Sequence, residues 1–372
     1  MSDINTAALK ENFAAVAEHG TDAVALYFYS YLFLRFPETR DMFPPGMTKQ
    51  RDRLVGALAR IVSNVDQVDE LVPYVEDLGR DHRKFGTLSA HYPAVGEALL
   101  TTLRHFSGSA WTDSLAADWA AAYGIIAGAM SGAAEKASQT EPACWDAEII
   151  GVDRRTFDIA VLTVRTDEPV PYVAGQSVSV EPTTTRAREW RWFTPANAPG
   201  GTDFELHARL VPGGAVSTAL VRASRPGDKL RLGPPFGRMT LDQASERPLL
   251  MVAGSTGLAP MKAMIEQVAR NGGRPTHLYF GARSVREVYD GTALAALDEC
   301  HKWLTIVTAV SDDIRWTGRH GLIGDIAAAD DDWSGHDVYV CGSPVMVEAS
   351  VKQLLATGVQ EAQIKFEEFG EA

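Results

Sequence analysis

The segment LVPYVEDLGRDHRKFGTLSAHYP, residues 71–93, carries an apolar helical face that ends in a histidine. Three apolar residues lie at i, i+4 and i+7 on one side of this helix: Leu71, Val75 and Leu78. His82 follows at i+11 on the same side, so we expect its imidazole to point into the core. There it is either a metal ligand or a core histidine whose ring bonds a backbone carbonyl. Tyr92, ten residues later, opens a second apolar run, so a tyrosine is expected near the ring.

Length and charge restrict the class of the protein. With 372 residues and 45% hydrophobic content, the chain can form two or three domains with separate cores. The net charge of -13 argues against binding to nucleic acid or anionic membranes. The first residues do not resemble a signal peptide, and no run of about 20 uncharged apolar residues could span a bilayer. We therefore expect a cytoplasmic protein without stable membrane insertion.

The three cysteines are scattered along the chain at Cys144, Cys300 and Cys341. No CxxC spacing occurs, which argues against a disulfide framework, a zinc site or an iron-sulfur cluster. Any redox centre should therefore be a bound organic or haem cofactor.

Residues 1–138 are predicted to form an all-α domain, because helical periodicity continues without a convincing alternating strand. Asn5 or Thr6 is a plausible cap of the first helix. Thr21-Asp22 can cap the next helix, which is apolar nearly all round and carries Tyr29. Such a helix is expected at the centre of the domain.

Two further residues of the helical domain attract attention. Pro37 starts a short turn that ends at Phe43, and the following helix has Gln50 at its front and Leu54 on the same face. Gln50 could be a polar group in an apolar pocket. Taken alone, a tyrosine at position 29 is more often a core residue and a glutamine at position 50 more often a surface amide, because nothing local demands otherwise.

Residues 143–246 consist of short alternating segments separated by Gly, Pro and Asp turns, which predicts an antiparallel β-barrel. Arg191, Phe193 and Thr194 place a cation, an aromatic face and a hydroxyl on one strand. That set suits a flat heterocycle with a phosphate, although an ordinary strand can also contain it.

A glycine turn of the same domain leads from a strand into a helix and contains Gly214, Val216 and Ser217. Backbone N–H groups at such a helix start can cradle a pyrophosphate. Gln176 precedes another strand of the predicted barrel. Together these pieces predict a cofactor site on the barrel.

Residues 247–372 alternate apolar strands with helices, which predicts a parallel, doubly wound α/β sheet. The loop after its first strand either holds the phosphates of a dinucleotide or is only a tight connection. The residues of interest there are Gly254, Thr256, Gly257 and Pro260. A second loop, with Cys341, Gly342 and Pro344, is expected at the same sheet edge.

Three polar residues follow the second strand of this sheet at Arg283, Ser284 and Arg286. They lie where a 2'-phosphate could be recognised, but solvated loop charges would look the same. We favour NADH over NADPH.

The helical domain resembles the globin domain of the flavohaemoglobins. Its distal pattern is matched by Tyr29, Pro37, Phe43, Gln50 and Leu54. Its proximal pattern is matched by His82, Phe85, Tyr92, Pro93, Val95, Gly96 and Glu97. The resemblance implies that the domain binds haem b. His82 would bind its iron, and Phe43 and Leu54 would contact the haem. It also implies catalytic roles for Tyr29, Gln50 and Tyr92.

Two positions depart from the pattern of that family. The glutamate that usually bonds the proximal histidine is replaced by Ala134, with Glu135 one step on. A carboxylate partner makes a histidine a stronger donor to its metal, so a weaker electronic push is expected here. In the family a lysine is common immediately before this histidine, and here that residue is Asp81. The resemblance therefore does not imply the family's contact between domains.

The remainder of the chain is similar to the ferredoxin-NADP reductase superfamily, with its Arg-x-Tyr-Ser and Gly-x-x-Ser/Thr signatures. The matching residues are Arg191, Phe193, Thr194, Gly214 and Ser217. Phe193 keeps the stacking face of the usual tyrosine but lacks its hydroxyl. The resemblance implies that FAD binds, less tightly than with tyrosine, and that Gln176 and Val216 belong to the same site.

The same resemblance extends to the last domain. It implies that the glycine-rich loop and the Cys-Gly-x-Pro loop flank the nicotinamide of NADH or NADPH, with Cys341 near the ring. Phe369, in the terminal segment Phe366–Gly370, would stack on the flavin.

The combination implies a nitric oxide dioxygenase, in which electrons pass from NAD(P)H through FAD to haem and oxygenated haem converts nitric oxide to nitrate. Oxygen and nitric oxide would be its small-molecule substrates, and the protein a monomer or weak dimer. Two alternatives remain open. A haem reductase of hydroperoxides or nitrite would turn over peroxide faster than nitric oxide. A gas or redox sensor would reduce its haem slowly and retain oxygen tightly.

Overall fold

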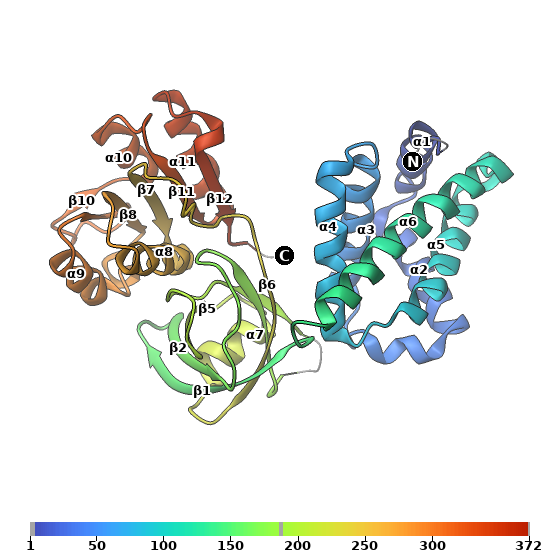
Figure 1. Cartoon of the computed structure of the whole chain (residues 1–372), viewed down its shortest axis with the longest axis horizontal. Helices are drawn as coiled ribbons and strands as arrows, with labels where there is room; N and C mark the ends of the chain where they lie inside the picture. Colours follow the sequence, from blue (N-terminus) through green and yellow to red (C-terminus); the bar gives the residue numbers. More distant parts are fainter. Residues whose placement is uncertain (1–3, 186–188, 371–372) are drawn as a thin grey trace. The chain divides into compact units, whose positions relative to one another are not determined.

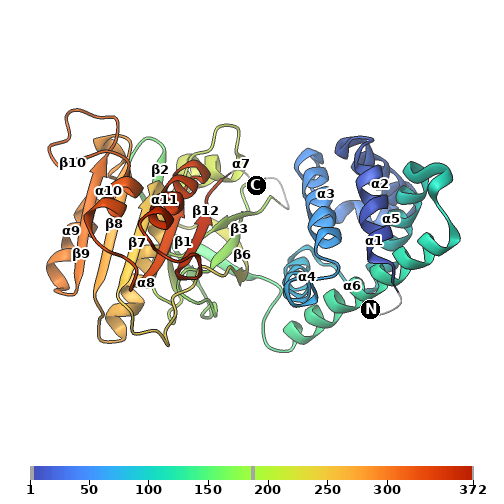
Figure 2. The same cartoon turned by 90° about the horizontal axis from the view of Figure 1, so that it is seen from above.

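The computed structural model describes residues 4–185 and 189–370. Residues 1–3 and 371–372, the outer ends of the predicted terminal domains, lie outside the described residues. Contacts divide the described chain into two compact units, residues 4–144 with residue 189, and residues 145–185 with 190–370. Figures 1 and 2 show that the first unit is helical and that the strands belong to the second. This order of fold classes confirms the prediction.

The first unit contains α-helices joined by short 3-10 turns. The α-helices are α1 (Thr6–Ala17), α2 (Thr21–Arg35), α3 (Thr48–Ser63), α4 (Val68–His82), α5 (Tyr92–Ser107) and α6 (Asp113–Ser138). The turns are η1 (Pro37–Met42), η2 (Arg83–Phe85), η3 (Ser89–His91) and η4 (Gly108–Ala110). Asn5 caps α1 by accepting a hydrogen bond from the Ala8 N–H at 3.1 Å. The predicted Thr21-Asp22 cap is wrong, because α2 already includes both residues and follows Gly20 without a side-chain cap.

Two apolar cores hold the helices together. The larger core includes the buried residues of α2, which are Val24, Ala25, Phe28, Tyr29 and Leu32. The smaller core lies between α4 and α6 and contains Leu71, Val75 and Met130. The apolar stripe that leads to His82 therefore faces the core.

The second unit begins with a six-stranded antiparallel sheet of order β4-β3-β6-β1-β2-β5. Its strands are β1 (Trp145–Arg154), β2 (Ile159–Thr166), β3 (Ser177–Pro182), β4 (Arg191–Phe193), β5 (Asp203–Arg209) and β6 (Lys229–Phe236). A bridge between Pro195 and Leu206 joins the two ends of the sheet, so the barrel is nearly closed. The short helix α7 (Ala215–Thr218) and the π-helical turn η5 (Ala219–Ala223) follow β5.

A six-stranded sheet of order β10-β9-β8-β7-β11-β12 completes the second unit, and its paired strands are parallel. Its strands are β7 (Leu249–Gly254), β8 (Thr276–Ala282), β9 (Leu304–Val310), β10 (Arg319–His320), β11 (Asp337–Gly342) and β12 (Ile364–Glu368). Its helices are α8 (Leu258–Arg270), α9 (Gly291–Cys300), α10 (Ile323–Asp330) and α11 (Pro344–Ala356). Short turns are η6 (Ser255–Gly257), η7 (Val285–Glu287) and η8 (Glu361–Gln363).

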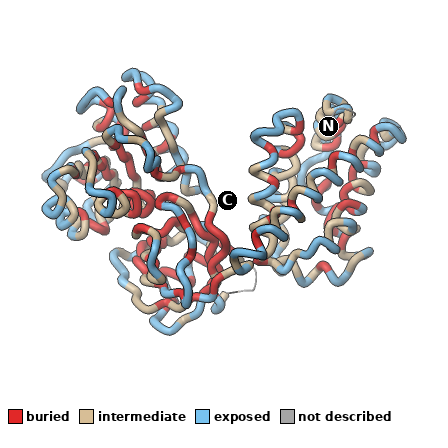
Figure 3. The backbone as a smooth tube through the Cα atoms, in the orientation of Figure 1, coloured by how far each residue is buried: buried red, intermediate tan, exposed pale blue. Residues whose placement is uncertain are grey.

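Helices cover both faces of this parallel sheet. Residues of α8 and α9 pack in one core, whereas residues of α10 and α11 pack in another. The first of these cores also includes Ile159 and Val161 of β2, so an apolar seam joins barrel and parallel sheet within the second unit. In Figure 3 the strands of both sheets appear as the most continuously buried segments.

No helix among the described residues is long and apolar enough to cross a membrane.

Candidate functional site

A polar pair lies in the core of the helical unit. Tyr29 is 4% exposed, and the Gln50 amide donates a hydrogen bond to its phenol oxygen at 3.1 Å. Burial raises the pKa of Tyr29 to about 12, although the hydrogen bond from Gln50 opposes this shift. The phenol therefore keeps its proton at neutral pH. The distance from the phenol oxygen to the main-chain carbonyl oxygen of Gln50 is long, at 3.5 Å, so the hydroxyl remains available as a donor.

Apolar groups surround this pair. The ring of Phe43 meets Tyr29 edge-on, with centroids 5.4 Å apart. Leu54 packs on the same core and lines a small apolar cavity with Phe28, Leu58 and other side chains. A hydrogen-bond donor in such surroundings has little competition from water and acts strongly on a charge that forms next to it.

His82 ends α4 with one ring nitrogen already committed. Nδ1 donates to the Leu78 carbonyl oxygen at 2.6 Å, which leaves the lone pair of Nε2 without a hydrogen-bond partner among the described residues. Burial lowers the pKa of His82, so the ring is neutral. A neutral imidazole with one fixed N–H and one free lone pair is the form that binds metal, and this arrangement fits a haem iron ligand.

The surroundings of His82 agree with the departures seen in the sequence. Glu135 is exposed on α6 and Ala134 carries no acceptor, so a backbone carbonyl is the partner of the histidine. Asp81 pairs with the buried Lys84 at 2.6 Å. Tyr92 packs in the core that contains Leu71 and Val75, but its phenol makes no hydrogen bond with His82.

A chain of three hydrogen-bonding side chains crosses the second unit. Thr194 Oγ1 and Ser177 Oγ lie 2.8 Å apart, and Ser177 donates to Glu367 Oε1 at 3.0 Å. The other oxygen of Glu367 is buried and has no hydrogen-bond partner in the part of the chain that the structure describes. Burial raises the pKa of this carboxyl, and the hydrogen bond from Ser177 lowers it only in part. An unsatisfied buried oxygen beside the predicted flavin residue Thr194 fits a polar cofactor edge.

Ser177 and Glu367 were not predicted from the sequence. Glu367 reaches the barrel because β12 pairs with β11, where it lies opposite Cys341. No local spacing signals this contact, since the two residues are 190 positions apart. The thiol of Cys341 is buried, and burial raises its pKa well above the ordinary value, with the charge of Glu367 acting in the same direction.

The other predicted flavin residues lie on the barrel. Arg191 and Phe193 pair with Val180 and Val178 of β3. Gln176 uses its amide oxygen to accept from the Val173 N–H at 2.9 Å and so shapes its own turn.

The glycine turn before α7 is held by a hydroxyl. Ser217 Oγ accepts from the Val211 N–H at 3.1 Å and donates to the Gly214 carbonyl at 3.2 Å. A Cβ at Gly214 would lie 2.7 Å from Ser217 Oγ, so glycine is needed for this shape of the turn. Val216 is buried behind the turn. The first N–H groups of α7 have no intrahelical partner, as a phosphate cradle requires.

The two predicted dinucleotide loops are brought together. Strands β7 and β11 are parallel neighbours, and Ala253 pairs with Cys341 at their carboxyl ends. A Cβ at Gly257 would collide with the Cys341 carbonyl and with the Gly342 nitrogen, so the loops touch. The Phe369 N–H donates to the Gly342 carbonyl at 2.6 Å, which places the terminal segment beside them.

The remaining loop residues frame this edge. Gly254 and Thr256 are partly buried, Pro260 is buried in α8, and Pro344 begins α11. The predicted site residues thus form a helical group in the first unit and a barrel and sheet group in the second.

Comparison with known proteins matches three family models in chain order. They are a globin model over residues 26–130, an oxidoreductase FAD-binding domain over 146–241 and an oxidoreductase NAD-binding domain over 251–352. A flavohemoprotein of Bordetella parapertussis is 29% identical, and the alignment covers 98% of this chain and 97% of that protein. The chain belongs to the flavohaemoglobin family.

A solved flavohaemoglobin supports the fold. The crystal structure from Malassezia yamatoensis, which contains FAD and haem, has a TM-score of 0.82 at 19% identity and covers 98% of each chain. The reductase half also resembles a dioxygenase-system reductase of Ralstonia sp, which is 31% identical over 59% of this chain and 67% of that protein. As a flavohaemoglobin with FAD- and NAD-binding domains, the protein is an oxidoreductase with haem, FAD and a nicotinamide dinucleotide as cofactors.

Proposed function

We propose that this flavohaemoglobin is an NAD(P)H-dependent nitric oxide dioxygenase, which uses oxygen to convert nitric oxide to nitrate. The observation that carries the proposal is the Tyr29–Gln50 pair in an apolar core. A phenol that stays protonated and faces no competing water is suited to stabilise oxygen as it gains negative charge.

His82 would hold the iron through Nε2, and Phe43 and Leu54 would supply apolar contacts to the haem. When bound, haem supplies the centre at which oxygen and nitric oxide react, and FAD supplies it with the electrons of NAD(P)H. Gln50 orients Tyr29, because its amide donates to the phenol oxygen and leaves the hydroxyl proton free to point elsewhere. The apolar side chains around them exclude water.

Residues of the barrel would bind and orient FAD. Arg191 offers a cation for phosphate, and Phe193 and Phe369 offer aromatic faces. The Thr194, Ser177 and Glu367 series can hold a proton near the flavin, because the buried carboxyl keeps its proton to higher pH than an exposed glutamate does.

The loops that begin at Gly254 and Cys341 would bind the dinucleotide at the carboxyl edge of the parallel sheet. We propose NADH as the preferred donor. Arg283 already pairs with Glu287 at 3.2 Å, so its charge is partly compensated.

Stopped-flow absorbance tests the proposal. The haem- and FAD-loaded protein is reduced with NADH in air, nitric oxide is added, and the Soret band and nitrate are followed. Rapid decay of the oxygenated spectrum, with nitrate formed in step with NADH consumption, is the expected result.

Other outcomes would replace the proposal. Faster turnover of hydroperoxide than of nitric oxide would indicate a peroxide reductase, although the backbone carbonyl partner of His82 argues for a weak electronic push. Slow haem reduction with tight oxygen retention would indicate a sensor.

A further inference from the structure

Strand β5 of the barrel has a polar face that the proposed chemistry does not use. Side chains alternate along a strand, so Glu205, His207 and Arg209 share one side. The residues on the other side of the strand, Phe204, Leu206 and Ala208, are buried in the barrel core. Each of the three polar residues contacts the part of the second unit that carries the parallel sheet. We call this set the β5 polar face.

Lys262 of α8 is the central partner of the β5 polar face. Its ammonium donates to Glu205 Oε1 at 2.7 Å and to Asp290 Oδ2 at 2.6 Å. The carboxylate of Asp290 is fully buried and also accepts from Arg155 of the barrel at 3.1 Å. A buried charge is stable only when it is paired and hydrogen-bonded, so these contacts fix the position of α8 against the barrel.

His207 extends the same network. Its Nε2 lies 2.8 Å from Glu205 Oε1 and its Nδ1 lies 2.7 Å from the Tyr289 hydroxyl. Glu205 is ionised, because the hydrogen bond from His207 and the charge of Lys262 outweigh its burial and lower its pKa to about 2. The carboxylate only accepts, so Nε2 carries the proton and Nδ1 accepts from Tyr289.

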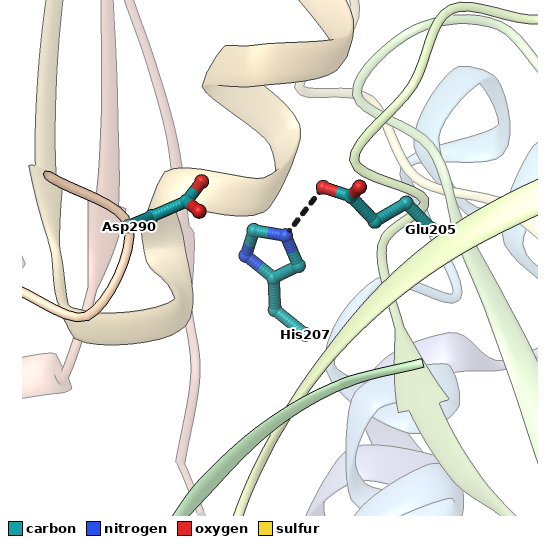
Figure 4. Close-up of side chains that lie close together, drawn as sticks. All are labelled: Glu205, His207 and Asp290. Carbon is teal, nitrogen blue, oxygen red and sulfur yellow. Dashed lines mark hydrogen bonds and ion pairs between the residues drawn. The ribbon is translucent and has the colours of Figure 1, made fainter. Parts of the chain in front are cut away.

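Figure 4 shows Glu205, His207 and Asp290 pointing toward one another. Their ligand atoms lie within 4.8 Å of each other, a spacing that could hold a metal ion. However, the Lys262 ammonium is already bonded to both carboxylates and compensates their charge. The cluster is therefore better described as a junction between barrel and sheet than as a metal site.

Arg209 contacts the glycine-rich loop itself. Its Nη1 donates to Ser255 Oγ at 2.7 Å, and its Nε donates to Asp158 at 3.1 Å, which fixes the guanidinium. Ser255 has a φ of 53°, the one positive value at a non-glycine residue in the described chain. Such a conformation is unfavourable for serine and persists only when neighbouring groups hold it. Arg209 supplies one such contact from outside the loop.

We propose that the β5 polar face positions the nicotinamide dinucleotide, with Arg209 holding Ser255 in the phosphate loop and Glu205 and His207 holding the helix behind it. This rests on the proposed binding of NAD(P)H to that loop. Residues of the FAD barrel would then control how well NADH binds and how fast it reduces the flavin. They are positioning residues, because they act through Ser255 and Lys262.

A double-mutant cycle tests this role. Arg209→Met, Ser255→Gly and the combined variant are prepared in the full FAD-loaded chain, and the dissociation constant of unreactive NAD+ is measured by calorimetry. Arg209→Met should weaken binding on the order of tenfold, because a charge-assisted hydrogen bond is lost. In the Ser255→Gly background it should cost about twofold or less, since glycine adopts positive φ without support.

Anaerobic stopped-flow reduction of the flavin by NADH provides the second readout. The apparent affinity for NADH should follow the same cycle, and Arg209→Lys should restore much of it. Arg165→Met is the matched control, because Arg165 pairs with Asp203 at 2.7 Å within the barrel and, among the described residues, has no hydrogen bond or ion pair to the loop. Hydrogen exchange of residues 254–262 should rise in Arg209→Met and stay unchanged in Arg165→Met.

Some results would decide against the inference, and a different one would decide against the proposed function. Equal losses in both Ser255 backgrounds, or no loss in either, would overturn the role of Arg209. Poor folding of Arg209→Met would shift the test to Asp158→Asn, which frees the same guanidinium and should raise loop exchange; unchanged exchange would overturn the role. Failure of NADH and NADPH to reduce the flavin of the unaltered chain would instead overturn the proposed function.

Discussion

Tyr29 owes its chemical character to its surroundings. Its pKa of about 12 results from burial, against which the Gln50 hydrogen bond acts, so the phenol is protonated throughout the physiological range. Tyr29→Phe removes the donor and should speed oxygen dissociation on the order of 10- to 100-fold, the range for hydrogen bonds to charged groups. Flash photolysis or stopped-flow mixing measures this rate. Tyr31→Phe is the control on the same helix, because Tyr31 bonds the exposed Glu97.

The same pKa predicts a flat pH profile. Between about pH 6 and 9 the Tyr29 proton is not lost, so the oxygen dissociation rate should not change through this group. A rate that rises steeply with pH in the unaltered protein, but not in Tyr29→Phe, would contradict the raised pKa.

His82 is the residue on which haem retention should depend. His82→Ala removes the free Nε2 lone pair and should abolish haem binding while FAD is retained, because the flavin residues lie in the other unit. Absorbance at the Soret and flavin bands measures both cofactors in one sample. Exposed His105→Ala is the matched control and should keep both. Full haem content in His82→Ala would disprove the ligand assignment.

Glu367 should make stability depend on pH. Its pKa is raised by burial, so the folded protein holds this proton more tightly than the unfolded chain does. The resulting contribution to the free energy of unfolding is fully present below the ordinary glutamate pKa and is lost as the pH rises through the raised pKa of the folded protein. In Glu367→Gln, urea unfolding should show a smaller fall in the free energy of unfolding between about pH 4 and 8. An identical profile in both proteins would refute the raised pKa.

At the level of elements, local sequence predicted what is decided locally. Pro37 starts η1 and the turn closes at Phe43, because proline suits the first position of a helical turn. The His82 face was readable because helical periodicity and burial agree over α4. The cap of α2 was mispredicted, because Gly20 supplies the positive φ that leads into the helix and no side chain is needed.

Strand β12 is the element on which the flavin site should depend most. It carries Glu367, and the next residue but one, Phe369, bonds Gly342 through its N–H. Removing residues 369–372 should speed FAD release about tenfold through loss of an aromatic contact. Flavin fluorescence on dilution measures the rate. Phe366→Ala is the control, since that ring is 54% exposed; equal release from both variants would argue against Phe369.

At the scale of the whole molecule, the order of fold classes was predictable and the contacts between distant segments were not. Barrel and sheet could be recognised from alternation and from strand-helix repeats, because each signal fits in a short window. The Ser177–Glu367 and Arg155–Asp290 contacts span 190 and 135 residues. They exist only once strand order and parallel register are set, and neither of these can be predicted from the local patterns of a single sequence. The division at residues 246 and 247 remains a prediction.

The long separation between Ser177 and Glu367 also has a consequence during synthesis. A ribosome that adds about 5 to 20 residues per second needs roughly 10 to 40 seconds to pass from one to the other. Until Glu367 has been made, the hydroxyls of Ser177 and Thr194 can have only each other as partners in this series. Any flavin that binds to the barrel before then would lack the contact with Glu367, so we expect its full affinity only after β12 has been translated.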